Sequence, residues 1–383
     1  MRACVLTTVH PYNDNRIFYK QIRTLLKAGY QVTYIAPCPP GVNHLEGIDL
    51  VPLPPLPRSR RPLNWWRALR AGLRSQADVF HFHDPELIGV GFLLQALTGR
   101  PVIYDVHENY PQAMMDKQWI PALLRPAVAG GMRVFEWLAV QILDGAVAAN
   151  PAIYDRLRKP SRRLASVSNY VDIGLFDTAR GLASFTPNCP YFIYAGSLSS
   201  ERGVLDCVAA FERLSYKDAE LVLIGRLDDT DLSIRNLSGQ LPRAVRLLDA
   251  QPFEYIPPLL RRSCAGLVPF HSTPNHLLAL PNKLLEYMAA SIPVIASDLP
   301  LIRAVVKEAG CGLLVEPGNV EQLAEAMAYI LDHPAEAEEM GRRGRCAVVE
   351  RYSWETEARK LLRLYGELLR QSTPGLRSEA DGE

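Results

Sequence analysis

The chain has 383 residues, 48% of them hydrophobic and 22% charged, and its formal net charge is +1 at pH 7. This length exceeds the usual size of one hydrophobic core, so we expect two domains, and the near-neutral charge gives no sign of a nucleic-acid partner. The 7 cysteines are scattered without a C-x-x-C pair, which argues against a zinc site and favours a reducing compartment. We find no signal peptide and no long apolar run, and therefore expect a soluble or membrane-peripheral protein.

Short apolar runs alternate with amphipathic stretches along the chain, a pattern typical of β-α-β units in a parallel sheet. In the first half, strands are predicted at 3–9, 31–36, 78–83, 102–106, 146–149 and 164–167. A helix is predicted at 16–28, where Gly29 provides a favourable C-terminal cap. Each half has enough strands for a Rossmann-like sheet of its own.

In the second half, strands are predicted at 191–194, 221–224, 245–248, 265–269, 292–296 and 312–315. The polar stretch 173–190 is the predicted linker between a first domain at 1–172 and a second at 191–352. A last helix is predicted at 353–370, with Ser353 as its N-cap. The fold class is therefore α/β, with two doubly wound parallel sheets.

The segment 281–300, PNKLLEYMAASIPVIASDLP, carries the strongest functional signal. Pro281 suits the first turn of a helix, which would begin beyond the carboxyl end of the preceding strand, where open α/β sheets bind ligands. The free N–H groups at such a helix start attract an anion such as a diphosphate. Glu286 would repel a phosphate but could accept two hydrogen bonds from a sugar diol. Together these features indicate a nucleotide-sugar site.

This segment resembles the donor signature of the retaining GT-B glycosyltransferases of family 4, also called group 1. Glu286 matches the glutamate that binds the donor ribose in that family, and the matching residues after it are Met288, Ala289, Pro293, Val294 and Ile295. The chain departs from the pattern at Leu278, where the family has a first glutamate linked to the donor sugar, and at Ser291, where a glycine is usual. How the sugar would be held is therefore open.

Further segments resemble the family at 10–37, 104–111, 194–203 and 316–319, so the resemblance spans nearly the whole chain. It implies the GT-B fold, in which two Rossmann-like domains face a cleft and the C-terminal helix returns to the first domain. It also implies the donor side of the site, with the base pocket expected near 249–253. The expected donor-binding residues are Gly196, Ser197, Arg202, Gly203, Asn282, Lys283, Leu284 and Glu286.

The sequence offers candidate cations that could neutralise the donor diphosphate. Arg202 lies where the family keeps a lysine that neutralises the diphosphate, and the flanking glycines would let the backbone approach a phosphate. Ser197 replaces an arginine that is frequent in the family, and Lys283 is a candidate for the missing cation. The leaving diphosphate becomes more negative as the sugar bond breaks, so such cations would be catalytic. An ordinary solvated Arg202 is the alternative.

In the first half, His107 matches a histidine that the family keeps near the reaction centre, and we expect it to hydrogen-bond the donor sugar. The expected catalytic residues are thus His107, Arg202 and Glu286. Glu108 could either orient His107 or contact the acceptor. Asp14 and Arg16 are acceptor-side candidates, although Asp14 or Asn15 could equally cap the predicted helix.

His81, His83, Asp84 and Glu86 together resemble a set of metal ligands. However, the family normally needs no bound metal, and Asp84-Pro85-Glu86 is typical of a helix start with acidic residues in its first turn. We therefore expect no metal and no other cofactor. His83 and Glu86 remain acceptor-side candidates.

The segment 57–76, PRSRRPLNWWRALRAGLRSQ, predicts a helix with an apolar side at Leu63, Trp66, Leu69 and Leu73. Its basic residues are Arg58, Arg60, Arg61, Arg67, Arg70 and Arg74. Such a helix could dock on an anionic membrane. It could equally cover the sheet and leave a solvated basic face.

The resemblance implies a retaining glycosyltransferase that moves a sugar from a nucleotide-diphosphate donor, with a UDP-sugar favoured, to a glycan or lipid-linked acceptor. The expected setting is cell-surface polysaccharide synthesis, in the cytoplasm or at the inner face of the plasma membrane. Two alternatives remain: a non-catalytic GT-B scaffold, inactivated at Leu278 and Ser197, and a sugar-nucleotide epimerase on the same fold. An NAD enzyme is disfavoured because no G-x-G-x-x-G follows a predicted strand.

Overall fold

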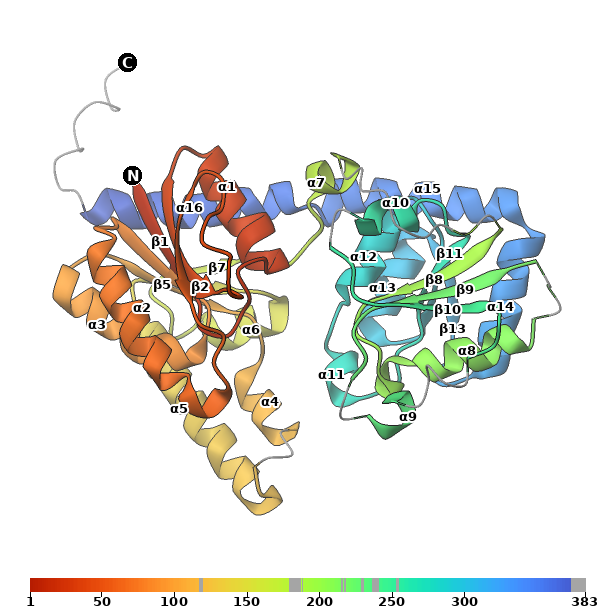
Figure 1. Ribbon diagram of the computed structural model, residues 1–383, viewed down its shortest axis with the longest axis horizontal. Helices are drawn as coiled ribbons and strands as arrows, with labels where there is room; N and C mark the ends of the chain where they lie inside the picture. The colour runs from red at the N-terminus through yellow and green to blue at the C-terminus, as the bar shows by residue number, and fades with distance from the viewer. Residues whose placement is uncertain are drawn as a thin grey trace. The chain divides into compact units, whose positions relative to one another are not determined.

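The computed structural model describes residues 1–116, 120–178, 187, 189–214, 216, 218–228, 231–235, 241–252 and 255–372. The chain divides into two compact units (Figure 1). Unit 1 comprises Met1–Asn169 and Trp354–Glu383, and unit 2 comprises Tyr170–Ser353. The predicted linker at 173–190 forms helix α7 (Ile173–Thr178) at its start and otherwise lies largely outside the described residues.

Unit 1 contains a parallel seven-stranded sheet with the order β3-β2-β1-β4-β5-β6-β7. The strands are β1 (Arg2–Leu6), β2 (Gln31–Pro37), β3 (Ile48–Leu53), β4 (Val79–Phe82), β5 (Val102–Val106), β6 (Gly145–Ala148) and β7 (Leu164–Ser166). The edge strand β3 was not predicted, because it is only partly buried along its length and contains a proline, which weakens the strand pattern. The other six expected strands are confirmed.

Helices cover both faces of this sheet. They are η1 (Asn15–Ile22), α1 (Arg23–Lys27), η2 (Arg58–Arg60), α2 (Pro62–Arg74), η3 (Pro85–Leu87), α3 (Ile88–Thr98), α4 (Tyr110–Asp116), η4 (Ala122–Leu124), α5 (Arg125–Ile142), α6 (Pro151–Leu157) and α16 (Trp354–Ser372). The predicted helix at 16–28 exists, but its first part, η1, is π-helical. Gly29 follows its end at a φ of 83°, as expected of a capping glycine.

The last helix, α16, belongs to unit 1, which confirms the expected return of the chain. Its inner face, represented by Leu361, Leu364 and Tyr365, is buried in the same hydrophobic cluster as side chains of β1, β2 and η1. The Trp354 indole donates a hydrogen bond of 2.9 Å to the hydroxyl of Thr24 in α1. The C-terminal helix is thus part of the unit 1 core.

Unit 2 has a parallel six-stranded sheet with the order β10-β9-β8-β11-β12-β13. The strands are β8 (Tyr191–Ala195), β9 (Glu220–Ile224), β10 (Val245–Leu248), β11 (Ala265–Val268), β12 (Val294–Ser297) and β13 (Gly312–Val315). All six were predicted, with small differences at their ends. The helices of unit 2 after α7 are η5 (Ser200–Arg202), α8 (Val204–Glu212), α9 (Leu232–Arg235), α10 (Ile256–Leu260), α11 (Pro274–Leu277), α12 (Asn282–Ala289), α13 (Pro300–Ala309), α14 (Val320–Asp332) and α15 (Pro334–Arg351).

The strand order reverses once in each sheet, and this determines where ligands can bind. In unit 1 the reversal lies between β1 and β4, and in unit 2 between β8 and β11. Open α/β sheets bind ligands beyond the carboxyl ends of the strands at such a point. The loops after β1, β4 and β5, and those after β8 and β11, are therefore the places to look for a site.

The packing of α12 on β11 yields a test of the unit 2 core. A Cβ atom added at Gly266 would lie 2.2 Å from ring atoms of Tyr287, whose hydroxyl accepts a hydrogen bond of 2.9 Å from the N–H of Ala195. Gly266→Ala should therefore destabilise the protein by about 1–3 kcal/mol through overpacking. Gly130→Ala in α5, which meets nothing within 4 Å, is the matched control and should not lower the thermal midpoint. Equal midpoints for the two variants would contradict this packing.

Candidate active site

In unit 2, the loop between β8 and α8 is shaped by two glycines. Gly203 precedes α8 at a φ of 70°, and a Cβ there would lie 1.9 Å from the carbonyl oxygen of Pro269, just after β11. Gly196 follows β8 at a φ of 135°, and its Cβ would lie 3.2 Å from the ammonium nitrogen of Lys283. Only glycine permits both the backbone conformation and these approaches. The loop therefore lies close against the start of α12 and the end of β11.

The Lys283 side chain is the most unusual group of unit 2. It is buried in the first turn of α12, and its Nζ lies 3.3 Å from the ring centroid of Tyr194 and 5.3 Å from that of Phe270. Within the described part of the chain, this Nζ has no hydrogen-bond partner. Burial, and then the nearby Arg202, lower the pKa of Lys283 well below its ordinary value. A buried ammonium that lacks a partner is costly, and an anion bound beside Lys283 would stabilise its charged form.

Arg202 and Glu286 lie near this ammonium. The Arg202 guanidinium is 5.7 Å from the Phe270 ring that Lys283 also approaches, and the side chain is half-buried. Glu286 is half-buried one turn after Lys283 and close enough to affect its pKa. The structure thus brings together two cations, a glycine loop and one carboxylate, which are the groups expected for a nucleotide-sugar diphosphate.

Several details differ from the sequence expectations. Pro281 is the N-cap of α12 rather than part of its first turn, because its ψ of 134° is extended. Leu284 is buried in the core and its N–H donates to the carbonyl oxygen of Pro281, which gives it a packing role. Ser197 and Asn282 are exposed, and Leu278 is 60% exposed where the family has a carboxylate.

Sequence reasoning missed a second group after β11. His271 Nε2 lies 2.6 Å from an oxygen of Asp206, and His276 Nδ1 lies 2.9 Å from the carbonyl oxygen of His271. The His276 ring stacks on Phe270 with centroids 4.4 Å apart. His276 thus packs on the ring that Arg202 approaches. The position of His271 and His276 just beyond a predicted strand was the available signal.

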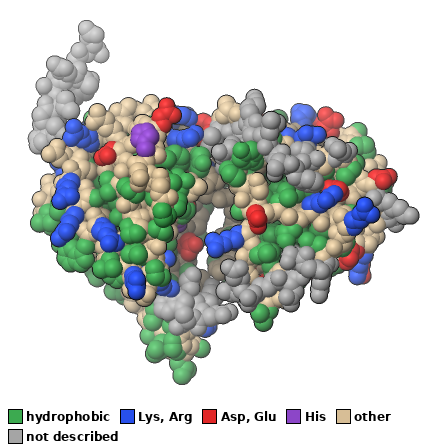
Figure 2. All heavy atoms as spheres, viewed as in Figure 1, with side chains coloured by type: hydrophobic (Ala, Val, Ile, Leu, Met, Phe, Trp, Pro, Cys, Tyr) green, Lys and Arg blue, Asp and Glu red, His purple; other side chains and the backbone are tan. Residues whose placement is uncertain are grey.

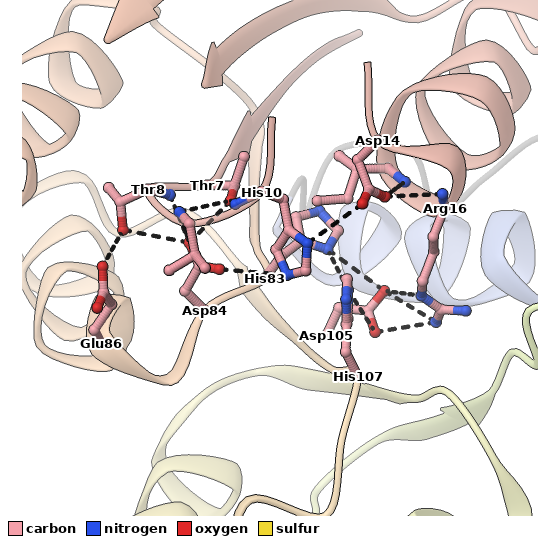
Figure 3. Close-up of polar contacts among 12 residues, drawn as sticks. Thr7, Thr8, His10, Asp14, Arg16, His83, Asp84, Glu86, Asp105 and His107 are labelled. Carbon is pink, nitrogen blue, oxygen red and sulfur yellow. Dashed lines mark hydrogen bonds and ion pairs between the residues drawn. The ribbon is translucent and has the colours of Figure 1, made fainter. Parts of the chain in front are cut away.

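In unit 1, the centre of the polar cluster is Asp105 on β5 (Figure 3). Its carboxylate is fully buried and accepts hydrogen bonds from the Arg16 guanidinium at 3.0 and 3.1 Å and from Gln21 Nε2 at 2.5 Å. Burial acts to raise the pKa of Asp105, but Arg16 and the neighbouring histidines outweigh it and lower that pKa. Asp105 is therefore an ionised and well-compensated carboxylate.

His107 is held by this cluster. Its Nε2 lies 3.0 Å from Nδ1 of His83 and 3.6 Å from an oxygen of Asp105. Burial lowers the pKa of His107 to about 3 and that of His83 well below its ordinary value, so both rings are neutral near pH 7. The expectation that Glu108 could orient His107 is therefore wrong: His83 and Asp105 do so, and Glu108 is exposed. His83 is itself fully buried.

His10, in the loop after β1, is a partly exposed neighbour that sequence reasoning did not single out. Its ring centroid lies 4.8 Å from that of His107, and its nitrogens lie 3.3 Å from Asp14 and 3.6 Å from Asp84. Burial acts to lower the pKa of His10, but the two carboxylates outweigh it and raise that pKa. The charged form of His10 is therefore favoured more than that of an ordinary histidine. Asp14 also caps η1, as the alternative reading expected.

Asp84 is the N-cap residue of η3, with Glu86 in the first turn, as expected of a helix start, but its side chain makes no capping hydrogen bond. Its carboxylate is buried and instead accepts from the Thr7 hydroxyl at 3.0 Å and from the Thr8 N–H at 2.5 Å. Among the described residues, Asp84 is also not part of the set of possible metal ligands formed with His81 and His83. Asp105 takes that place, with ligand atoms of the three residues within 4.8 Å of one another. Because the Arg16 guanidinium already pairs with Asp105, this geometry favours a hydrogen-bonded cluster over a metal site.

Both units match models of known protein families. Residues 15–175 match the model described as Glycosyltransferase Family 4, and residues 183–346 match that of Glycosyl transferases group 1. The chain is 24% identical to the glycogen synthase of Mycobacterium tuberculosis, over 89% of this chain and 87% of that protein. It is also 24% identical to the phosphatidyl-myo-inositol mannosyltransferase of Mycolicibacterium smegmatis, over 89% and 86%.

Solved structures show the same fold. The sucrose-phosphate synthase of Thermosynechococcus elongatus superposes with a TM-score of 0.74 at 20% identity, covering 97% of this chain and 99% of that one. The HepE protein of Anabaena, solved with UDP-glucose, gives 0.69 at 13% identity over 96% and 100%. The chain has two Rossmann-like parallel sheets, and each half of it matches a model of this family. It therefore belongs to the GT-B glycosyltransferases of family 4.

Proposed function

We propose that this glycosyltransferase transfers a sugar, with retention of anomeric configuration, from a nucleotide-diphosphate donor to a glycan or lipid-linked acceptor. The observation that carries the proposal is the buried ammonium of Lys283, which lies without a hydrogen-bond partner among the described residues, between a glycine loop and a helix start. A diphosphate would compensate this charge. A UDP-sugar is favoured because structural relatives were solved with UDP and UDP-glucose.

The donor roles follow from the charges of unit 2. Lys283 and Arg202 would bind the diphosphate and stabilise the negative charge that it gains as the sugar bond breaks. Arg202 is placed for this because it is half-buried and shares the neighbouring Phe270 ring with Lys283. Glu286 would accept two hydrogen bonds from the ribose. Protein cations take the role that a divalent metal has in other transferases, so we propose that neither a metal nor another cofactor is needed.

In unit 1, His107 is assigned to the donor sugar, where a neutral imidazole can donate or accept a hydrogen bond without attracting the diphosphate. The acceptor-side residues would be Asp14, Arg16, His83, Glu86 and Glu108. Among these, Arg16 and His83 are buried and would act through Asp105 and His107. A direct contact is open to Glu108, which is exposed, and to Glu86, which is partly so.

The proposed setting is cell-surface polysaccharide synthesis at the inner face of a plasma membrane. None of the helices in the described ranges is long and apolar enough to span a bilayer. A peripheral contact through Arg58–Arg74 is supported by the exposure of Arg67, Arg70 and Arg74 on α2. Of the four apolar residues expected on the inner side of α2, only Leu69 is buried.

The alternative of an inactive scaffold has one observation in its favour, the exposed Leu278 in place of a carboxylate. Incubation with a panel of UDP- and GDP-sugars tests the proposal. Release of the nucleotide diphosphate, with a product whose new bond has the donor's anomeric configuration by NMR, would support the retaining transferase. No turnover of any donor would favour the scaffold, and a changed sugar nucleotide without acceptor would favour an epimerase.

Glu286→Ala should weaken UDP binding by more than about tenfold, because hydrogen bonds to a charged group contribute roughly 1.5–3 kcal/mol each. Isothermal titration calorimetry measures this directly. Glu325→Ala is a matched control, because Glu325 is an exposed glutamate within α14. If the two variants bind UDP alike, Glu286 does not hold the ribose.

His107→Gln should lower turnover but leave UDP affinity nearly unchanged, since His107 is assigned to the sugar. Burial keeps the pKa of His107 near 3, so its ring stays neutral throughout pH 5–8. The variant should therefore have the same shape of pH–rate profile as the wild type over that range. Loss of a titration from the profile would show that His107 changes charge during turnover, against this assignment.

A further inference from the structure

Helices α2, α3 and α5 lie side by side on one face of unit 1 (Figure 1) and carry several exposed apolar side chains. Trp66 of α2 is 66% exposed, Leu97 of α3 is 63% exposed, and Leu123 just before α5 is 94% exposed. Trp66, Leu93 and Phe135 line a groove of about 420 Å³ where the three helices meet. A surface of this kind marks an interaction site, because soluble proteins rarely expose such extended apolar area.

The charges around this surface are mostly positive, and the carboxylate that lines the groove, Glu86, is half-buried and lies 3.6 Å from the Arg61 guanidinium. α2 and α3 contain no acidic residue, and the single one in α5, Glu136, is buried and pairs with Arg156 at 2.7 Å. Basic residues flank the apolar surface from η2 and α2 and at Arg125 and Arg133 of α5. In Figure 2, basic side chains lie among hydrophobic ones over this part of unit 1.

We propose that the face formed by α2, α3, η4 and α5 inserts its exposed apolar side chains into an anionic lipid bilayer. Apolar side chains at the centre and arginines around them are the composition of interfacial membrane elements. A second copy of the chain fits less well, because a two-fold contact would bring arginines against arginines. This inference concerns a different surface from the donor site and does not depend on which sugar is transferred.

The proposed membrane contact thus includes apolar side chains in addition to the basic segment Arg58–Arg74. Leu123 and Leu124 in η4 precede Arg125, so two exposed leucines are followed directly by a cation. In a bilayer, the leucines would enter the acyl region and the guanidinium would stay at the headgroups. Binding should then have a component that resists salt, which a purely electrostatic contact lacks.

Sedimentation with vesicles of phosphatidylglycerol and phosphatidylcholine tests the proposal. The double variant Leu123→Asp/Leu124→Asp should bind about tenfold more weakly or worse for each leucine withdrawn from the bilayer. The control is Leu301→Asp/Val349→Asp, which changes two exposed apolar residues of unit 2 in the same way and should bind like the wild type. Part of the wild-type binding should persist at about 0.5 M salt, where surface charges are screened.

Three results would overturn the proposal: no wild-type binding to anionic vesicles at low salt, equal binding by the two double variants, or binding that salt removes completely. A wild-type dimer that the Leu123→Asp/Leu124→Asp variant converts to a monomer, without vesicle binding, would assign the face to self-association instead. Stabilisation by UDP, measured in parallel, should be the same in every variant. The proposed membrane contact and the proposed donor site are therefore tested independently.

Discussion

Unit 2 of this glycosyltransferase is organised around one buried amino group without a hydrogen-bond partner among the described residues, that of Lys283. Removing a charged group from water costs several kcal/mol unless a partner is provided, and the ring of Tyr194 returns only about 2 kcal/mol through a cation–π contact. Gly196 keeps the space beside the ammonium free of a side chain. We expect an apolar residue at 283 to make the free protein more stable, which supports the proposal that Lys283 binds a ligand.

In unit 1, by contrast, the buried charge of Asp105 has partners within the unit. The Asp105 carboxylate is surrounded by Arg16, Gln21 and histidines, so its charge is balanced within the unit. Burial favours the neutral form of its neighbours His83 and His107, while Asp14 and Asp84 raise the pKa of the partly exposed His10. Unit 2 thus offers positive charge that suits a diphosphate, and unit 1 offers a hydrogen-bonding surface that suits a polyhydroxylated molecule.

The fold could be predicted well because buried parallel strands are continuous apolar runs. Twelve strands were located this way, whereas β3 was missed because an edge strand is only partly buried. The π-helical start at Asn15–Ile22 could not be predicted, since the apolar spacing that signals an α-helix does not distinguish the two.

Candidate site residues could be identified from the sequence where they lie in a local motif. Contacts between residues that are far apart in the sequence could not be predicted in this way. Glu286, Arg202 and His107 were singled out as candidates because they lie in local motifs that resemble the family. The pairing of Arg16 with Asp105 joins residues far apart in the sequence, and so does the placement of His10 near His107. Asp84 has the sequence position of a helix cap, but tertiary contacts to Thr7 and Thr8 decide its role.

The central claim is that Lys283 exists to bind a diphosphate, and the affinity difference between UDP and UMP tests it most directly. Calorimetry on the wild type should show that UDP binds much more tightly than UMP. In Lys283→Met, which keeps the length of the side chain and removes its charge, most of that difference should disappear, by roughly tenfold or more for one charge-assisted hydrogen bond. The unliganded variant should also be at least as stable as the wild type. An unchanged ratio of UDP to UMP affinity in a folded Lys283→Met protein would contradict the account.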